Sequence, residues 1–318
     1  MAKILLLEPS WGGIGHDPQD LEYASCVAKE YADEYADELR NLGHEVIEIE
    51  EPYANEANIA IRQQNPDLVW WVGHGEMCIT TLQEQDIWIS NFNTDFCSLR
   101  GVCCQDFNLD ILKDTIANAL SCVTGKELGK KAVEHGCLAY LGYVDNFIFL
   151  GCETQPCPCA NEPPEGELPE LVRPEIFAKV IRCMHDSNFY FNYSLAQGKT
   201  TGEAFNDSIE RFNYWINEFE NTEPQNDTEA GLLNEAIFVL THDRDNQALH
   251  GRTDIKLGEH PVKRCEDYTT QEECEAAGCY WYDNACHTFP QITIPKEWFI
   301  YGSFLLSFIG FVSTSKIR

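Results

Sequence analysis

A histidine and a cysteine each follow a stretch that can form a strand of a parallel sheet. His74 and Gly75 follow the apolar run 67–73, and Cys122 follows residues 115–121, for which propensity alone allows a strand or a helix. The active crevice of an open parallel sheet lies at the carboxyl ends of its strands, and neighbouring strands are about 4.8 Å apart. If the two stretches are neighbouring strands, the His74 imidazole and the Cys122 thiol face one crevice.

This pair of side chains has the chemistry of a cysteine nucleophile and its base. A thiol attacks a carbonyl only as the thiolate, and a nearby imidazole promotes that ionisation. Gly75 and Gly125 would let a substrate approach the backbone closely, and the Gly75 N–H could stabilise an oxyanion. A histidine after a strand is often only a loop residue, and a lone cysteine is often a small buried apolar side chain. Spacing alone therefore leaves a non-catalytic interpretation open.

The elements that would position these residues alternate along 1–258. The predicted strands are 3–7, 45–48, 67–73, 137–143 and 236–240, and the predicted helices are 21–42, 55–64, 126–135, 174–197 and one that begins at the capping box 200–203. Such alternation predicts an α/β fold with a mostly parallel sheet flanked by helices. Residues 76–114 form a long insertion between the two candidate catalytic strands, and 151–170 is a loop rich in proline and acid.

The composition excludes some classes of function. The chain has 318 residues, with 52 acidic and 22 basic side chains and a formal net charge of −30. Phosphate binding needs a basic patch, so nucleic acid is not an expected partner. The hydrophobic fraction of 44% excludes a wholly disordered acidic chain.

The 15 cysteines indicate an oxidising compartment. Cys26, Cys137 and Cys183 fall on predicted helices or strands and are interpreted as core residues. The candidates for disulfides are in a small cysteine-rich module over 259–292, and they are Cys265, Cys274, Cys279 and Cys286. A zinc site formed by Cys279, Cys286 and His287 is the alternative for this module, although the spacing matches no zinc finger known to us.

The C-terminal segment 297–315 is predicted to be a transmembrane anchor. It contains 18 uncharged residues from Trp298 to Ser315, and a helix of that length covers about 27 Å, roughly the core of a bilayer. The alternative is a buried core helix. Lys316 and Arg318 favour a cytoplasmic tail and an extracellular body. The N-terminus shows no signal peptide, which argues the other way and leaves a cytosolic protein with a peripheral tail as a further alternative.

The ordered set of motifs over 1–258 resembles the caspase-like (clan CD) cysteine peptidases, and the gingipain-like and clostripain-like branches are nearest. The motifs are His74-Gly75, Ser121-Cys122, Thr124-Gly125, Leu128-Gly129, Ala139-Tyr-Leu-Gly-Tyr143, 196–204, Phe238-Val-Leu240 and Gln247-Ala-Leu-His-Gly251. The resemblance implies a caspase-like three-layer sandwich. It also implies a dyad of Cys122 as nucleophile and His74 as general acid and base, with an oxyanion hole formed by the backbone N–H groups of Gly75 and Cys122.

The substrate that the resemblance implies is a protein or peptide, cleaved next to a charged or polar residue. Asp17 and Asp145 lie in the loops from which this clan usually builds its selecting pocket, and carboxylates there would pair with Arg or Lys. No metal is expected in the catalytic site and no cofactor is required. Calcium is an option at Asp243, Asp245 and Asn246, as in some relatives. The alternative function is a caspase-fold surface protein for binding or adhesion that has lost turnover.

Overall fold

The computed structural model describes residues 1–8, 32–50, 53–73, 75–76, 79–81, 87–90, 109–148, 172–259, 270–271, 280–282 and 285–287. The chain divides into two compact units, Met1–His260 and Pro261–Arg318. The candidate site lies in the first unit.

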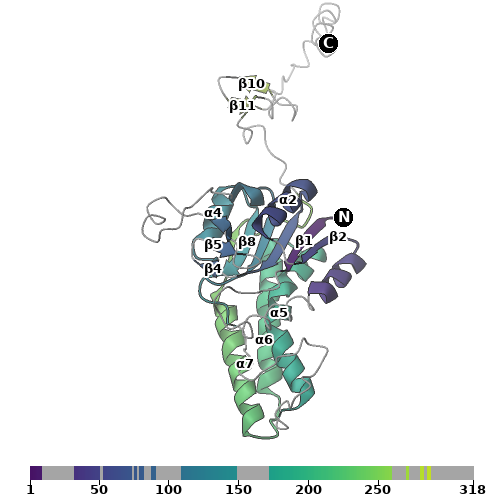
Figure 1. Ribbon diagram of the computed structural model, residues 1–318, viewed down its shortest axis with the longest axis vertical. Coiled ribbons are helices and arrows are strands. Elements are labelled where there is room, and N and C mark those ends of the chain that lie inside the picture. Colours follow the sequence, from purple (N-terminus) through teal and green to yellow (C-terminus); the bar gives the residue numbers. More distant parts are fainter. Residues whose placement is uncertain are drawn as a thin grey trace, which may run out of the picture. The chain divides into compact units, whose positions relative to one another are not determined.

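A six-stranded sheet forms the centre of this unit, in the order β2-β1-β3-β7-β8-β9 (Figure 1). Its strands are β1 (Lys3–Glu8), β2 (Glu45–Glu50), β3 (Leu68–Val72), β7 (Ile116–Leu120), β8 (Ala139–Tyr143) and β9 (Gln247–Gly251). The first five pair in parallel, and β9 pairs with β8 in the antiparallel direction. The predicted α/β class with a mostly parallel sheet is therefore confirmed.

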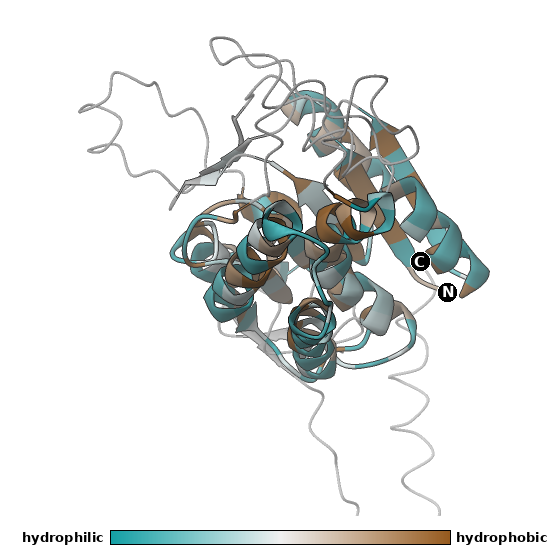
Figure 2. Cartoon of the chain, turned by 90° about the horizontal axis from the view of Figure 1, so that it is seen from below, coloured by the Kyte–Doolittle hydropathy of each residue, from teal (hydrophilic) through white to brown (hydrophobic). Residues whose placement is uncertain are grey.

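Helices cover both faces of the sheet, which makes three layers. One face is covered by the helical segment 32–41 together with α5 (Pro174–Ala196), α6 (Thr201–Glu220) and α7 (Asp227–Asn246). The other face is covered by α2 (Ala54–Gln64), the short helix η2 (Leu109–Leu112) and α4 (Leu128–Glu134). Alternate residues of a strand point to opposite faces, so Ile4 and Leu6 of β1 join the first core while Leu5 and Leu7 join the second. Figure 2 shows the hydrophobic and hydrophilic stripes of the helices that make these cores.

Local signals in the sequence account for the ends of several helices. Pro174 occupies the first turn of α5, where its missing N–H is not needed. At the start of α6, the Thr200 hydroxyl accepts from the Glu203 backbone N–H at 3.3 Å, and the Glu203 carboxylate accepts from the Thr200 N–H at 2.8 Å. This is the predicted capping box. Gly136, which follows α4, has φ +100° and supplies the left-handed turn that ends the helix.

The predicted strand over 236–240 is wrong, because these residues lie inside helix α7. Their β-branched and aromatic side chains favour a strand locally. The Asn226 side chain, however, accepts from the Glu229 N–H at 3.0 Å and starts a helix. Leu233, Ala236 and Leu240 then recur at helical spacing on its buried face. The last strand of the sheet is β9.

Residues 116–120, whose type the sequence left open, form the central strand β7. Asn118 in its middle is completely buried. Its amide donates to the Asn192 Oδ1 atom of α5 at 2.9 Å, and its own oxygen accepts from Asn188 at 3.3 Å. Buried polar side chains need such partners, so the long helix α5 is what allows an asparagine in the centre of this sheet.

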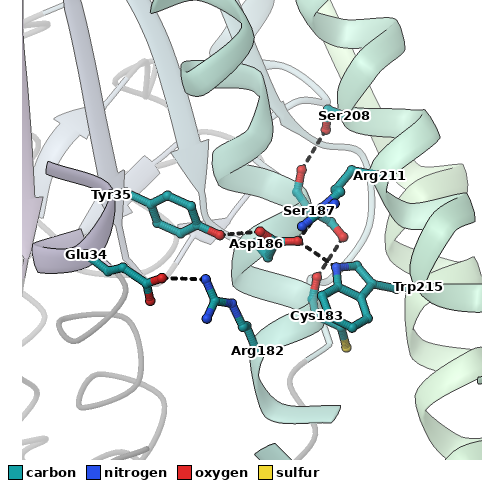
Figure 3. Close-up of polar contacts among 9 residues, drawn as sticks. All are labelled: Glu34, Tyr35, Arg182, Cys183, Asp186, Ser187, Ser208, Arg211 and Trp215. Atoms are coloured by element: carbon teal, nitrogen blue, oxygen red, sulfur yellow. Dashed lines mark hydrogen bonds and ion pairs between the residues drawn. The ribbon is translucent and has the colours of Figure 1, made fainter. Parts of the chain in front are cut away.

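A second buried polar cluster joins α5 to its neighbours (Figure 3). The Asp186 carboxylate of α5 accepts hydrogen bonds from the Tyr35 hydroxyl, from Arg211 and, at 2.6 Å, from the Trp215 indole. Burial and the Asp186 charge hold the pKa of Tyr35 well above its usual value. Because these partners come from the helical segment 32–41 and from α6, the cluster fixes the helical layer behind the sheet.

Two small sheets complete the described structure. The first unit contains the strands β4 (Gly75–Glu76), β5 (Ile79–Thr81) and β6 (Ile87–Ser90), which pair antiparallel. All of their residues except Gly75 belong to the predicted insertion 76–114. The second unit contains a hairpin of β10 (Tyr280–Tyr282) and β11 (Ala285–His287). No helix in the described part of the chain is long and apolar enough to cross a membrane. The predicted anchor 297–315 lies outside the described residues, as does the loop 151–170.

Candidate active site

The strands that precede His74 and Cys122 are neighbours. β3 and β7 pair in parallel with Val72 opposite Leu120, and the Gly73 N–H donates to the Leu120 oxygen at 3.1 Å. Their carboxyl ends therefore meet at one edge of the sheet, as the predicted arrangement requires. His74 lies outside the described residues.

Gly75 packs directly against the backbone of Cys122. A Cβ atom at position 75 would lie 2.2 Å from the Cys122 carbonyl oxygen, 2.4 Å from the Ser121 hydroxyl and 2.7 Å from the Thr124 methyl carbon. Such distances are far inside van der Waals contact, so only glycine fits at this position. The two residues predicted to form the oxyanion hole, Gly75 and Cys122, are thus in contact.

The side chain of Cys122 is half-buried and is a free thiol. It donates a hydrogen bond to the Phe147 backbone oxygen at 3.7 Å. Burial raises the pKa of this thiol, the hydrogen bond to Phe147 opposes that shift, and the charges of Asp243 and Asp145 add to it. A thiol in these surroundings stays protonated at neutral pH unless a base takes its proton.

The turn after Cys122 is strained and firmly bonded. Val123 has φ +58°, a left-handed conformation that a β-branched residue rarely adopts. Its N–H donates to the Asp145 oxygen at 3.0 Å, and the Gly125 N–H donates to the Tyr143 oxygen at 2.8 Å. These bonds to the end of β8 and to the segment that follows it hold the turn in place. Backbone strain of this kind concentrates at functional sites.

Asp145, one of the two predicted selecting carboxylates, lies in the segment 144–148 that borders Cys122. Its side chain is exposed, and its Oδ1 atom accepts from the Asn146 N–H at 2.8 Å. Its charge is close enough to contribute to the raised pKa of the Cys122 thiol. Its backbone oxygen accepts from the Val123 N–H, so the structure places Asp145 beside Cys122, the candidate nucleophile. Asp17 lies outside the described residues.

Sequence reasoning missed Asp243 as a part of this site. Its carboxyl group is completely buried in α7, and its Oδ1 atom accepts from the Ile148 N–H at 3.0 Å, which fixes the segment 144–148. Among the described residues, the Oδ2 atom finds no hydrogen-bond partner. Burial raises the pKa of this carboxyl group to about 8. No local signal could have found it, because the neighbouring residues 236–240 favour a strand and Ile148 lies 95 positions away in the sequence.

The three residues predicted to bind calcium each have a different partner in the structure. Asp243 bonds Ile148, Asp245 forms an ion pair with Arg244 at 2.8 Å, and the Asn246 amide donates to the His242 oxygen at 2.9 Å. Another acidic group lies towards the β2 edge of the sheet, where Glu8, Asp33 and Glu48 each place one carboxylate oxygen within 4.8 Å of the others. Glu48 is also paired with Arg40.

The other cysteines that the sequence analysis names differ in what the structure shows of them. Cys137 and Cys183 are buried free thiols, as predicted for core residues, and burial raises the pKa of Cys137 to about 12. Cys26, Cys265, Cys274 and Cys279 lie outside the described residues. Cys286 lies in β11, where its backbone is opposite Trp281. The predicted disulfides of the module therefore stay predictions.

Two further residues beside the nucleophile, Thr80 and Ser121, were not predicted. Ser121 was quoted only as the neighbour of Cys122, and Thr80 belongs to the insertion. Their hydroxyl oxygens are 3.1 Å apart and buried.

Comparison with known proteins assigns the chain to no family. No protein-family model and no curated protein sequence matches it.

Proposed function

We propose that the chain is a caspase-like cysteine endopeptidase that cleaves peptide bonds through Cys122 and His74. The observation that carries the proposal is the contact of Gly75 with the Cys122 backbone at the adjoining ends of β3 and β7. Gly75 follows His74 directly in the chain, so the contact ties the histidine segment to the nucleophile. The three-layer architecture with a mostly parallel sheet agrees with the fold that the resemblance implies.

The proposed reaction follows from the chemistry of these groups. His74 takes the proton of the Cys122 thiol, and the thiolate attacks the carbonyl carbon of the scissile bond. The backbone N–H groups of Gly75 and Cys122 stabilise the oxyanion of the tetrahedral intermediate. The histidine then gives its proton to the leaving amine, which produces a thioester with Cys122, and water hydrolyses this acyl-enzyme with His74 as base.

Asp145 supports a preference for a basic residue before the scissile bond. It is exposed and close to Cys122, and a carboxylate in such a position pairs with the guanidinium group of Arg or the ammonium group of Lys. In this proposal Asp145 selects the substrate and takes no part in the chemistry.

The experiment compares the wild-type chain with Cys122→Ala and His74→Ala. Each is incubated with fluorogenic peptides that carry Arg, Lys, Asp or Asn before the reporter, with and without calcium. Cys183→Ala is the matched control, because it removes a buried thiol of α5. The proposal predicts cleavage of the Arg and Lys peptides by the wild type and the control, and none by Cys122→Ala.

One observation favours a non-catalytic binding protein as the second candidate. The Cys122 thiol is bonded to a backbone oxygen, and its pKa is raised rather than lowered. A folded wild-type chain that cleaves none of the peptides and does not react with a peptide ketone would support that candidate.

We propose further that residues 259–292 form a cysteine-rich module and that residues 297–315 anchor the protein with its body outside the cell. The full chain should sediment with membranes, and a chain that ends at residue 292 should not. Thiol titration of the denatured, unreduced protein should then find few free cysteines. A fully reduced protein without a membrane fraction would instead support a cytosolic protein with a peripheral tail.

A further inference from the structure

Two residues that flank the candidate histidine segment are hydrogen-bonded to each other. Trp71 lies in β3, before His74 and Gly75, and Thr80 lies in β5, after them. The Trp71 indole N–H donates to the Thr80 hydroxyl oxygen at 3.0 Å, and both side chains are completely buried. This bond joins β3 to β5, the strands that precede and follow Gly75 in the chain.

The same hydroxyl connects these strands to the residue before the nucleophile. The Thr80 Oγ1 atom lies 3.1 Å from the Oγ atom of Ser121, which precedes Cys122 in the chain and is also buried. Because the indole N–H can only donate, Thr80 accepts from Trp71 and shares a second hydrogen bond with Ser121. A relay of three side chains therefore runs from β3 through β5 to the residue before the nucleophile.

Gly75 lies next to both members of the Thr80–Ser121 pair. It is the register partner of Thr80 in the β4–β5 pair, and a Cβ atom at position 75 would lie 2.4 Å from the Ser121 hydroxyl. Gly75 is thus paired with β5, which contains Thr80, and it also contacts Ser121 and Cys122. The Thr80–Ser121 bond bridges these two sets of contacts, so its length sets how closely Gly75 approaches the Cys122 backbone.

We infer that the Thr80–Ser121 hydroxyl pair is a positioning element that holds Gly75 against the Cys122 backbone for catalysis. The inference rests on the proposed peptidase function and adds a role for the insertion 76–114, which supplies Thr80. Neither hydroxyl touches the reacting atoms in this assignment. The pair acts through the backbone N–H of Gly75.

The test is the Thr80→Val variant of the full chain, which keeps the shape of the side chain and removes the hydroxyl. Thr80→Ser restores the hydroxyl and is the rescue variant. Ser208→Ala is the matched control, because Ser208 is an equally buried hydroxyl that bonds Gln247 at 3.1 Å in another part of the fold. Melting temperature, kcat and KM are measured for each with the best peptide substrate.

A positioning role predicts a specific pattern. Since a misplacement of about 1 Å can cost about 100-fold in rate, Thr80→Val should lower kcat by at least about ten-fold and leave KM within about two-fold. Thr80→Ser should recover most of that loss, and Ser208→Ala should lower the melting temperature without changing kcat. The double variant Thr80→Val, Ser121→Ala should lose no more activity than the more affected single variant.

Other outcomes overturn the inference in distinguishable ways. If the wild type turns over and Thr80→Val keeps kcat within two-fold of it, the inference is wrong and the proposed function stands. If no peptide is cleaved by the wild type, the proposed function fails and the inference fails with it. If Thr80→Val does not fold, Ser121→Ala with unchanged kcat contradicts the inference, and Ser121→Ala with a ten-fold lower kcat and an unchanged melting temperature supports it.

Discussion

The thiol of Cys122 donates its hydrogen bond to the Phe147 backbone oxygen, 3.7 Å away. The next residue, Ile148, donates its N–H to the buried carboxyl group of Asp243. The surroundings of the candidate nucleophile therefore depend on helix α7, which is far from it in sequence. Through this arrangement a buried carboxyl group influences the ionisation of the thiol.

Replacement of Asp243 by Asn should make the Cys122 thiolate form at lower pH. The Asn oxygen can still accept from the Ile148 N–H, and the negative charge that raises the pKa of the thiol is gone. The rate of alkylation of Cys122 by iodoacetamide, followed against pH, should shift to lower pH, with Cys122→Ala as the blank. Asp145→Asn is the exposed comparison. An unchanged profile in Asp243→Asn would contradict the electrostatic account of the site.

The same substitution should change how the folding stability depends on pH. In the unfolded chain Asp243 loses its proton near pH 4, and in the folded protein near pH 8. The folded state thus holds an extra proton between these values, so this residue makes the protein less stable as pH rises from about 4 to about 8. Urea unfolding should show Asp243→Asn gaining stability relative to the wild type across that window. Parallel curves for the two proteins would refute the buried, protonated carboxyl group.

The contribution of Glu229 to folding stability should depend on pH in the opposite direction to that of Asp243. Its buried carboxylate accepts from the Arg173 side chain at 2.9 Å and from the Gln225 N–H at 2.7 Å, and the bonds to Arg173 lower its pKa to about 2. The stability that it supplies is present above its unfolded pKa of about 4.3 and is lost as pH falls towards 2. Glu229→Gln should therefore have a lower melting temperature than the wild type at pH 6, and the difference should shrink at pH 2–3. A difference that stays constant with pH would rule out this ion pair.

Gly75→Ala should both destabilise the protein and abolish its activity. The added methyl group would lie 2.2 Å from the Cys122 carbonyl oxygen, and the backbone must shift, at a cost of about 1–3 kcal/mol. Gly231→Ala is the control, because position 231 lies in α7 with nothing within 4 Å of an added Cβ. That change should stabilise the helix by about 0.5–1 kcal/mol. Equal effects of the two substitutions on stability would contradict the close contact at Gly75.

Val123→Gly should raise stability while lowering kcat. Glycine adopts the φ of +58° without strain, which should add about 0.5–1 kcal/mol to the free energy of unfolding. A less constrained turn would hold Cys122 less firmly. Val144→Gly, at a position without a positive φ, should instead destabilise. Loss of stability in Val123→Gly would show that the turn is not strained by its valine.

The elements of this fold that have strong local signals could be predicted from the sequence. The proline at the start of α5, the capping box of α6 and the apolar runs of β1 and β3 act within a few residues, so they are readable without tertiary structure. The order of the strands then places the residues that follow β3 and β7 side by side. The proximity of Gly75 to Cys122 was predictable for that reason.

The parts that escaped prediction depend on partners far away in the chain. Residues 236–240 have strand propensity, but they are helical in the structure because their buried side chains pack in one core with those of α5 and α6. Asn118 looks misplaced in a central strand until Asn188 and Asn192 of α5 supply its hydrogen bonds. Thr80 is hydrogen-bonded to Ser121 across 41 positions of sequence, and Asp243 is hydrogen-bonded to Ile148 across 95 positions. No local sequence pattern reveals partners that are so far apart.

The most direct test of the account is labelling of the wild-type chain by a peptide chloromethyl ketone with Arg at the reactive end. Intact mass and peptide mapping would identify the labelled residue and its rate in wild type, His74→Ala, Asp145→Asn and denatured protein. The account predicts a single label on Cys122, at a rate at least about 100-fold above that of the denatured thiol. It also predicts loss of that advantage in His74→Ala and a slower reaction in Asp145→Asn. Labelling of Cys122 at the same rate in native, denatured and His74→Ala protein would contradict a catalytic Cys122–His74 pair.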